Sequence, residues 1–118
     1  MAKSWYWGHA SVGSLSLVFW QITSHAGIVT NNLYVTRGEK VLALGASTLT
    51  LKSDNSFTLS LDTGYSGRYS FTAVPSVVTV NLTVYHRRIG EMSGGLVGAK
   101  TEGPGPVLWE HMAPSPAL

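Results

Sequence analysis

The residues best suited to chemistry lie close to the N-terminus, in the segment Ser4-Trp5-Tyr6-Trp7-Gly8-His9-Ala10. Side chains alternate between the two faces of an extended strand, so Trp5, Trp7 and His9 would share one face. Two indoles beside an imidazole are typical of an apolar pocket wall that carries one polar group. Imidazole titrates near neutral pH, so His9 could donate or accept a hydrogen bond to an enol or a carbonyl. The segment therefore predicts an aromatic pocket, with these three side chains facing an interior cavity.

The same residues also have a purely structural interpretation. A single histidine on an aromatic strand is most often a structural residue, with a ring nitrogen bonded to a backbone carbonyl. Trp5 and Trp7 would then belong to the core, as large aromatic residues often do. In the C-terminal segment Trp109-Glu110-His111, alternation separates Trp109 and His111 from Glu110. The sequence leaves the pocket and core interpretations open for these aromatic residues.

Composition excludes several classes of site and partner. The chain has no cysteine, which excludes disulfides, thiolate metal sites and a cysteine nucleophile. Its four histidines never fall at metal-ligand spacing and its six carboxylates are scattered, so no metal site is predicted. A net charge of +2 from dispersed basic residues is too weak to follow a nucleic-acid backbone. No nucleophile elbow, phosphate-binding loop or dinucleotide fingerprint is present.

The expected compartment follows from two further features of the chain. No apolar stretch approaches the roughly 18 residues that a membrane span requires. The first residues lack the apolar core of a signal peptide. We therefore expect no membrane span and a cytoplasmic location.

Alternating apolar and polar residues, interrupted by turn residues, predict a chain of short antiparallel strands. Asp54-Asn55 and Asp62-Thr63-Gly64 are turn signals. The expected strands are 4–11, 14–23, 28–36, 40–45, 47–53, 57–62, 67–73, 77–87, 95–100 and 106–112. Such spacing is typical of an antiparallel barrel or sandwich. We expect more than half of the residues in strands and no helix longer than about three turns.

The domain organisation is simple, because 118 residues suffice for one domain with its own core. We expect one β-barrel domain over residues 1–112 and a disordered tail over residues 113–118. Glycines cluster between residues 90 and 105 and predict a loop there. That loop would either close one end of a barrel or simply connect to the last strand.

Two segments resemble a known family. Residues 4–10 and the following Val12-Gly13-Ser14-Leu15-Ser16-Leu17-Val18-Phe19-Trp20 resemble the start of the second domain of the hydroxyneurosporene synthase-like family. Within that family the similarity is to the fungal Diels-Alderases that form decalin and cytochalasan rings. The closing Gly105-Pro106-Val107-Leu108-Trp109-Glu110-His111 resembles the terminal strand of the family. The resemblance implies an all-β, antiparallel, lipocalin-like β-barrel.

The resemblance also implies an activity. The chain would be a cofactor-free cyclase, an isomerase that catalyses an intramolecular [4+2] cycloaddition of a linear polyene in fungal polyketide biosynthesis. Such a reaction needs a polyene held in one near-attack conformer and a hydrogen bond to the activating carbonyl. His9 would be the catalytic donor. The residues implied to bind the apolar polyene are Trp5, Trp7, Trp20, Tyr85 and Trp109.

Two alternatives stand beside the cyclase. The chain could be a non-catalytic barrel that binds an apolar metabolite, or a hydratase of an isoprenoid or carotenoid. The hydratase would need an acid to protonate an alkene, and Glu110 and Glu102 are the late candidates.

The resemblance has a consequence for partners. Family members contain two barrels, and the first barrel has no counterpart in this chain, nor has the His-Asp-x-Asn-Trp-Gly type segment that precedes the aromatic motif. The resemblance therefore implies a homodimer, or a partner that supplies the first barrel. His9 and the loop at residues 90–105 would lie near that junction.

Overall fold

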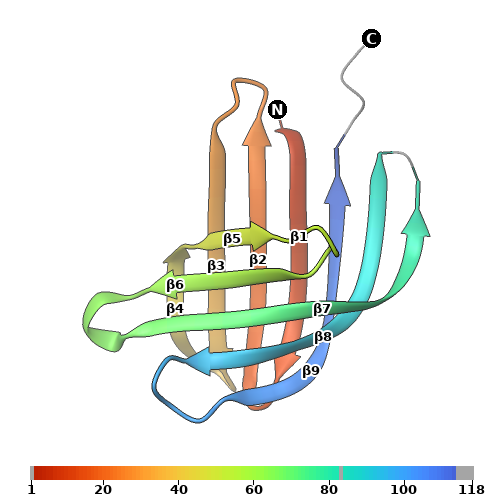
Figure 1. Ribbon diagram of the computed structural model, residues 1–118. Coiled ribbons are helices and arrows are strands. Elements are labelled where there is room, and N and C mark those ends of the chain that lie inside the picture. Colours follow the sequence, from red (N-terminus) through yellow and green to blue (C-terminus); the bar gives the residue numbers. More distant parts are fainter. Residues whose placement is uncertain (1, 83, 114–118) are drawn as a thin grey trace.

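The protein folds into nine β-strands, seen in a computed structural model that describes residues 2–82 and 84–113 (Figure 1). All but the first residue of the expected tail lie outside this described part. The strands are β1 (Ala2–Val12), β2 (Leu15–Ser24), β3 (Val29–Arg37), β4 (Lys40–Ala46), β5 (Thr48–Leu51), β6 (Phe57–Asp62), β7 (Arg68–Asn81), β8 (Tyr85–Leu96) and β9 (Glu102–Met112). The only helix within the described residues is the single 3₁₀ turn Gly64–Ser66. The prediction of an all-β chain is confirmed.

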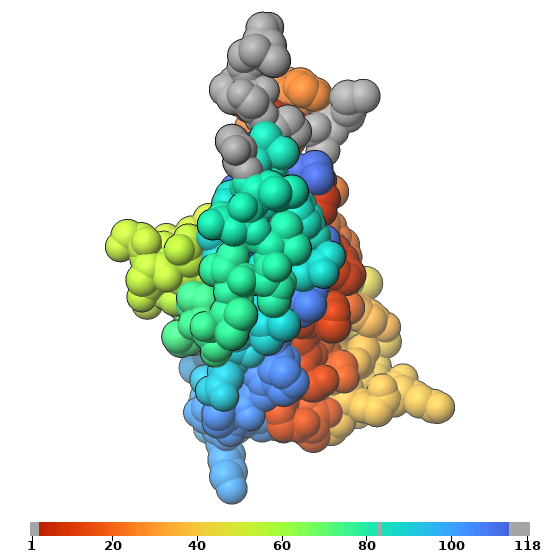
Figure 2. Space-filling view, turned by 90° about the vertical axis from the view of Figure 1, so that its right-hand side faces the viewer, coloured from red at the N-terminus to blue at the C-terminus, as the bar shows by residue number. Residues whose placement is uncertain are grey.

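All nine strands belong to one antiparallel sheet, in the order β4-β3-β2-β1-β9-β8-β7-β6-β5. The sheet curls so that β5 and β6 cross in front of its other half (Figure 1). Figure 2 shows the two layers from the side, with the β5–β6 turn and the β3–β4 turn projecting in opposite directions. The hydrogen-bonded ladder stays open between β4 and β5, at the two ends of the strand order. The antiparallel lipocalin-like architecture is as expected, in the form of a barrel with one open seam.

Local sequence explains how the central hairpin forms. A two-residue turn, Gly13-Ser14, joins β1 to β2. Gly13 has φ of 61°, a value that glycine adopts without steric cost. The alternation of residues 15–20 then places Leu15, Leu17 and Phe19 on the inner face of the curled sheet, where each is at most 2% exposed.

The core fills the space between the two layers. Aromatic rings join the layers: Phe57 of β6 lies 5.4 Å from Phe19 of β2 and 5.0 Å from Trp109 of β9, between ring centroids. Tilted and edge-on pairs of this kind are the favoured aromatic geometries. The other buried apolar residues are Ala10, Val12, Leu15, Leu17, Leu33, Val35, Ala43, Leu59, Leu61, Tyr69, Phe71, Ala73, Met92 and Val107. This packing fixes which face of every strand points inward.

The second half of the chain differs most from the predicted strands. β7 continues through Pro75, where the pairing with β8 is irregular, and ends at Asn81, so the strand expected over 77–87 is wrong. β8 then runs through residues 85–96, and the loop expected over 90–105 shrinks to residues 97–101. The glycines explain this difference. A Cβ at Gly90 would lie 2.9 Å from Pro75 Cα, and one at Gly94 would lie 2.7 Å from Phe71 Cα. These glycines let β7 approach β8 closely and are not loop residues.

Candidate functional site

Strand β1 presents its aromatic residues to both sides of the sheet. Trp5, Trp7 and His9 do share one face, but it is the outer one: Trp7 is 39% exposed and His9 is exposed. The expectation that they face an interior cavity is therefore wrong. The inner face of β1 carries Tyr6, Gly8 and Ala10 instead. Packing decides the side, because Gly8 pairs with both Phe19 and Trp109, and only a residue without a side chain leaves room for those two rings.

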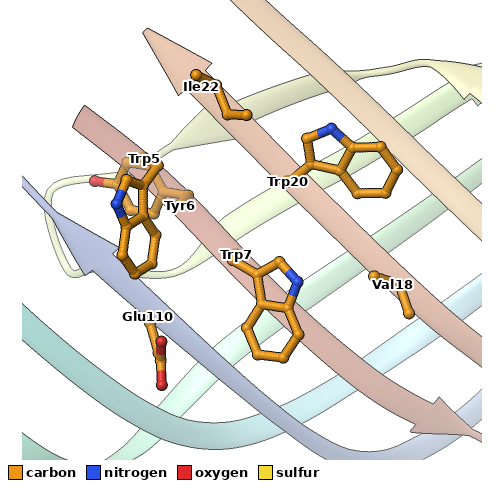
Figure 3. A pocket seen from close by; sticks show the side chains of 7 residues that line it. All are labelled: Trp5, Tyr6, Trp7, Val18, Trp20, Ile22 and Glu110. Atoms are coloured by element: carbon orange, nitrogen blue, oxygen red, sulfur yellow. The ribbon is translucent and has the colours of Figure 1, made fainter. Parts of the chain in front are cut away.

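The outer face of β1 and β2 forms an apolar depression, which we call the outer groove. Its cavity volume is about 400 Å³, within the usual size range of small-molecule sites. The groove is lined by Trp5, Tyr6, Trp7, Val18, Trp20, Ile22 and Glu110. Figure 3 shows the indoles of Trp5, Trp7 and Trp20 projecting to the same side, while the ring of Tyr6 lies behind Trp5. Strand register brings them together, since Trp7 pairs with Trp20 and Trp5 with Ile22.

A charged pair lies along one side of the outer groove. Glu110 of β9 accepts a hydrogen bond from Nε of Arg87 at 3.3 Å. The other end of the Arg87 guanidinium contacts the hydroxyl of Tyr85, also at 3.3 Å. Tyr85 packs edge-on against Trp5, with ring centroids 6.5 Å apart. The groove thus has aromatic walls and a charged rim.

His9 lies at the opposite end of the groove from Tyr85. Its ring packs edge-on against Trp7, with centroids 5.5 Å apart. A second depression of about 250 Å³ continues from His9 along the outer face of β8 and β9, next to Ile89 and Leu108. Within the described part of the chain the imidazole of His9 makes no hydrogen bond to a backbone carbonyl, which is the contact that a structural role would require. The ring is therefore available to a ligand.

The structure gathers five of the six predicted site residues on this surface and separates one. Trp5, Trp7 and Trp20 line the groove, while Tyr85 packs against Trp5 and His9 packs against Trp7. Trp109 is 1% exposed and packs in the core against Phe57, so it does not line the groove. Its place follows from pairing with Gly8 across β1 and β9.

Sequence reasoning missed the aliphatic part of the groove and the role of Arg87. Val18 and Ile22 lie on the same face of β2 as Trp20, so the alternation that placed Trp20 could have found them. Arg87 bridges Glu110 and Tyr85. Only the register between β8 and β9 reveals that contact.

Residues 2–82 and 84–113 contain no group of three or more histidine, cysteine or carboxylate side chains close enough to hold a metal ion. They also form no helix that is long and apolar enough to cross a membrane.

Comparison with known proteins finds solved structures with a similar fold but no matching family or curated sequence. No protein-family model matches the chain, and no curated protein matches its sequence. Two solved structures of the protein CghA do match, one of CghA and one of CghA with Sch210972, at TM-scores of 0.72 and 0.71 and 16% identity. Each match covers 99% of this chain and 42% of the CghA chain, so the chain spans less than half the length of CghA. This chain therefore has the fold of one part of CghA.

Proposed function

We propose that this chain is a cofactor-free cyclase that catalyses an intramolecular [4+2] cycloaddition of a linear polyene in fungal secondary metabolism. The observation that carries the proposal is the outer groove, whose walls include three indoles and whose charged groups, Glu110 and its partner Arg87, lie at the rim. The resemblance of residues 4–20 to Diels-Alderases supports it. So does the fold shared with CghA, which has been crystallised with the small molecule Sch210972.

The outer groove would meet most of the requirements of this reaction. Diene and dienophile exchange three π bonds for one π bond and two new carbon–carbon σ bonds, and no atom or proton enters or leaves. The main requirement is a folded chain whose reacting carbons are already close. The flat faces of Trp5, Trp7 and Trp20 would confine a polyene in such a conformer. Apolar walls of this kind also exclude water from the reacting carbons.

His9 is the residue that would activate the dienophile. A hydrogen bond from its imidazole to a carbonyl conjugated with the dienophile would stabilise the charge that develops on that oxygen. The edge-on contact between His9 and Trp7 supports a position for the imidazole at one end of the bound polyene. A single hydrogen bond to a neutral acceptor contributes roughly 0.5–1.5 kcal/mol, so its loss should slow turnover about threefold to tenfold.

We further propose that the outer groove works against a second protein surface. Trp7, Ile22 and Ile89 are each about two-fifths exposed on this face. Contiguous exposed apolar surface marks an interaction site. A second copy of this chain, or another barrel domain, would cover the groove and enclose the substrate.

The test is incubation with a linear polyene that carries a conjugated diene and an unsaturated tetramic acid or pyrrolone. Chromatography with mass detection separates the outcomes. A cyclised isomer of unchanged mass supports the cyclase. Tight binding without any new product would assign the chain to the carriers, and a product heavier by one water would assign it to the hydratases.

Matched variants sharpen this test. Trp20→Ala removes a groove wall and should abolish most turnover, while His9→Ala should reduce it about threefold to tenfold. His25→Ala is the control for His9→Ala, because His25 is exposed in the β2–β3 turn, away from the groove. Equal effects of the two histidine variants would refute the assignment of His9.

The hydratase alternative finds little support in the placement of its acids. Glu110 is held by Arg87, an ion pair that protonation would break. Glu102 lies at the other end of β9, where hydrogen bonds from Ser14 and then from Arg37 lower its pKa. Neither carboxyl is arranged to deliver a proton to an alkene in the groove.

A further inference from the structure

On the inner face of the sheet, one row of paired residues across five neighbouring strands is polar or titratable, while the next row is largely apolar. Register pairs Asn31 with Gln21, Gln21 with Tyr6, Tyr6 with His111, and His111 with His86. We call these five residues the inner polar row. The next row towards the core contains Leu33, Phe19, Gly8 and Trp109, all of them buried. The polar row therefore stands at the mouth of the core, on the opposite face of β1 from the groove-lining indoles.

Contacts within the inner polar row hold its side chains in order. Gln21 donates from Nε2 to Oδ1 of Asn31 at 2.9 Å. The ring of Tyr6 stacks on His111, with centroids 4.1 Å apart and planes 7° apart. His86 continues the stack, 6.1 Å from His111 and tilted by 14°. Three nearly parallel rings thus line the mouth, and their polar edges remain available to a ligand.

Arg88 is the unusual residue at this mouth. It pairs with Trp109, so its side chain starts from the buried row, and its Nε atom is buried without a hydrogen-bond partner among the described residues. The ion pairs of the described chain are Arg37–Glu102 and Arg87–Glu110, and neither involves Arg88. The inner polar row contains no carboxylate. A charged donor left unsatisfied in a buried position is costly, and an anion would satisfy it.

The protonation states of the neighbouring groups favour the same kind of ligand. Burial, followed by the charges of His86 and Arg88, lowers the pKa of His111. Burial raises the pKa of Tyr6, although the charge of Arg88 opposes this. At neutral pH, therefore, His111 is uncharged and Tyr6 keeps its proton as a hydrogen-bond donor. Arg88 then carries a positive charge at the mouth, which attracts anions and repels metal cations.

We propose that Arg88 and the inner polar row form a binding site for a planar organic carboxylate. The guanidinium would pair with the two carboxylate oxygens in the forked geometry that arginine favours, and Tyr6 would donate a further hydrogen bond. The stacked rings would contact the flat body of the ligand. Val78, which pairs with Arg88 on β7, is 48% exposed, so the strand beside Arg88 is itself open to solvent. This site shares Tyr6 with the lining of the outer groove but otherwise uses residues of the inner face, and it does not depend on the proposed cyclase activity.

The test is a titration with sodium benzoate at constant ionic strength, followed by NMR of the histidine ring signals. Benzoate should shift the His86 and His111 signals saturably and leave those of His9 and His25 in place. Benzamide, the neutral analogue, should bind at least about tenfold more weakly, because charge-assisted pairing is lost. The exposed His9 and His25 serve as internal references within the same spectrum.

Variants on one strand provide the matched comparison. Arg88→Gln should weaken benzoate binding at least about tenfold, whereas Arg87→Gln, on the outer face of β8, should leave it unchanged. If Arg88→Gln does not fold, Arg88→Lys keeps the charge without the fork and should bind less tightly than the unaltered protein. Equal binding by the Arg87 and Arg88 variants, or equal binding of benzoate and benzamide, would overturn the proposal. Zinc chloride shifting His86 and His111 where benzoate does not would identify a metal site instead.

Discussion

Gly8→Ala tests whether the glycine of the aromatic segment serves packing. A Cβ on Gly8 would lie 2.7 Å from the carbonyl oxygen of Leu108, 2.8 Å from Cβ of Trp109, and against Cζ of Phe19. Two of these three atoms belong to the backbone of β9 or sit directly on it, so they cannot move unless the strand moves. Overpacking of this kind costs about 1–3 kcal/mol. Alanine also reduces the conformational entropy of the unfolded chain, which stabilises the folded protein by about 0.4–1 kcal/mol. We therefore expect a net loss of about 1–2 kcal/mol.

Urea unfolding followed by tryptophan fluorescence measures this loss, as a lower midpoint at unchanged slope. Gly45→Ala is the matched control, because its new Cβ would lie 3.4 Å from Cδ1 of Leu61, an ordinary contact. That variant should be neutral or more stable by up to about 1 kcal/mol. A Gly8→Ala protein as stable as Gly45→Ala would refute the packing argument and leave the glycine without a structural reason.

Three further predictions follow from the placement of the aromatic and titratable residues. Trp109→Ala should cost about 3–5 kcal/mol of stability, and Trp7→Ala distinctly less while still reducing turnover; similar losses in urea unfolding would contradict the division between core and groove. The pKa of His111 is lowered in the folded state, so the unfolded chain binds more protons below about pH 6.5 and stability should fall as pH decreases from there towards the folded pKa. Unfolding measured between pH 7.5 and 5.5 checks this, and His111→Gln should flatten the decline. Light scattering over a dilution series should show reversible self-association that Trp7→Glu abolishes, unless a different partner covers the groove; a Trp7→Glu protein that associates like the unaltered chain would place the contact elsewhere.

The sequence predicts the first six strands well because each carries its own alternation and turn signals. It fails at β7 and β8, where Gly90 and Gly94 resemble loop residues but serve close strand approach. The shared face of Trp5, Trp7 and His9 was also predictable from parity. Its orientation was not, because both faces of β1 carry aromatic residues and only the packing of Gly8 against its neighbours selects the inner one.

The inner polar row could not be predicted in the same way. Its five residues come from five strands, and no local pattern in any one strand marks them. Each becomes significant only when the register of four strand pairs is known. The outer groove is easier to predict, because three of its lining residues are consecutive on β1 and three more alternate along β2.

Trp5, Tyr6 and Trp7 point alternately to two chemically different surfaces, so the function of β1 depends on the two-residue alternation of its side chains. A substitution changes one side chain and leaves this alternation intact, so the sheet can tolerate many substitutions. Deleting Trp7 while Gly8 keeps its place would turn Trp5 inward, to the mouth of the core, and Tyr6 outward. The spacing of these residues is thus constrained more tightly than their identity. Deletions and insertions here should be far less tolerated than exchanges of one aromatic residue for another.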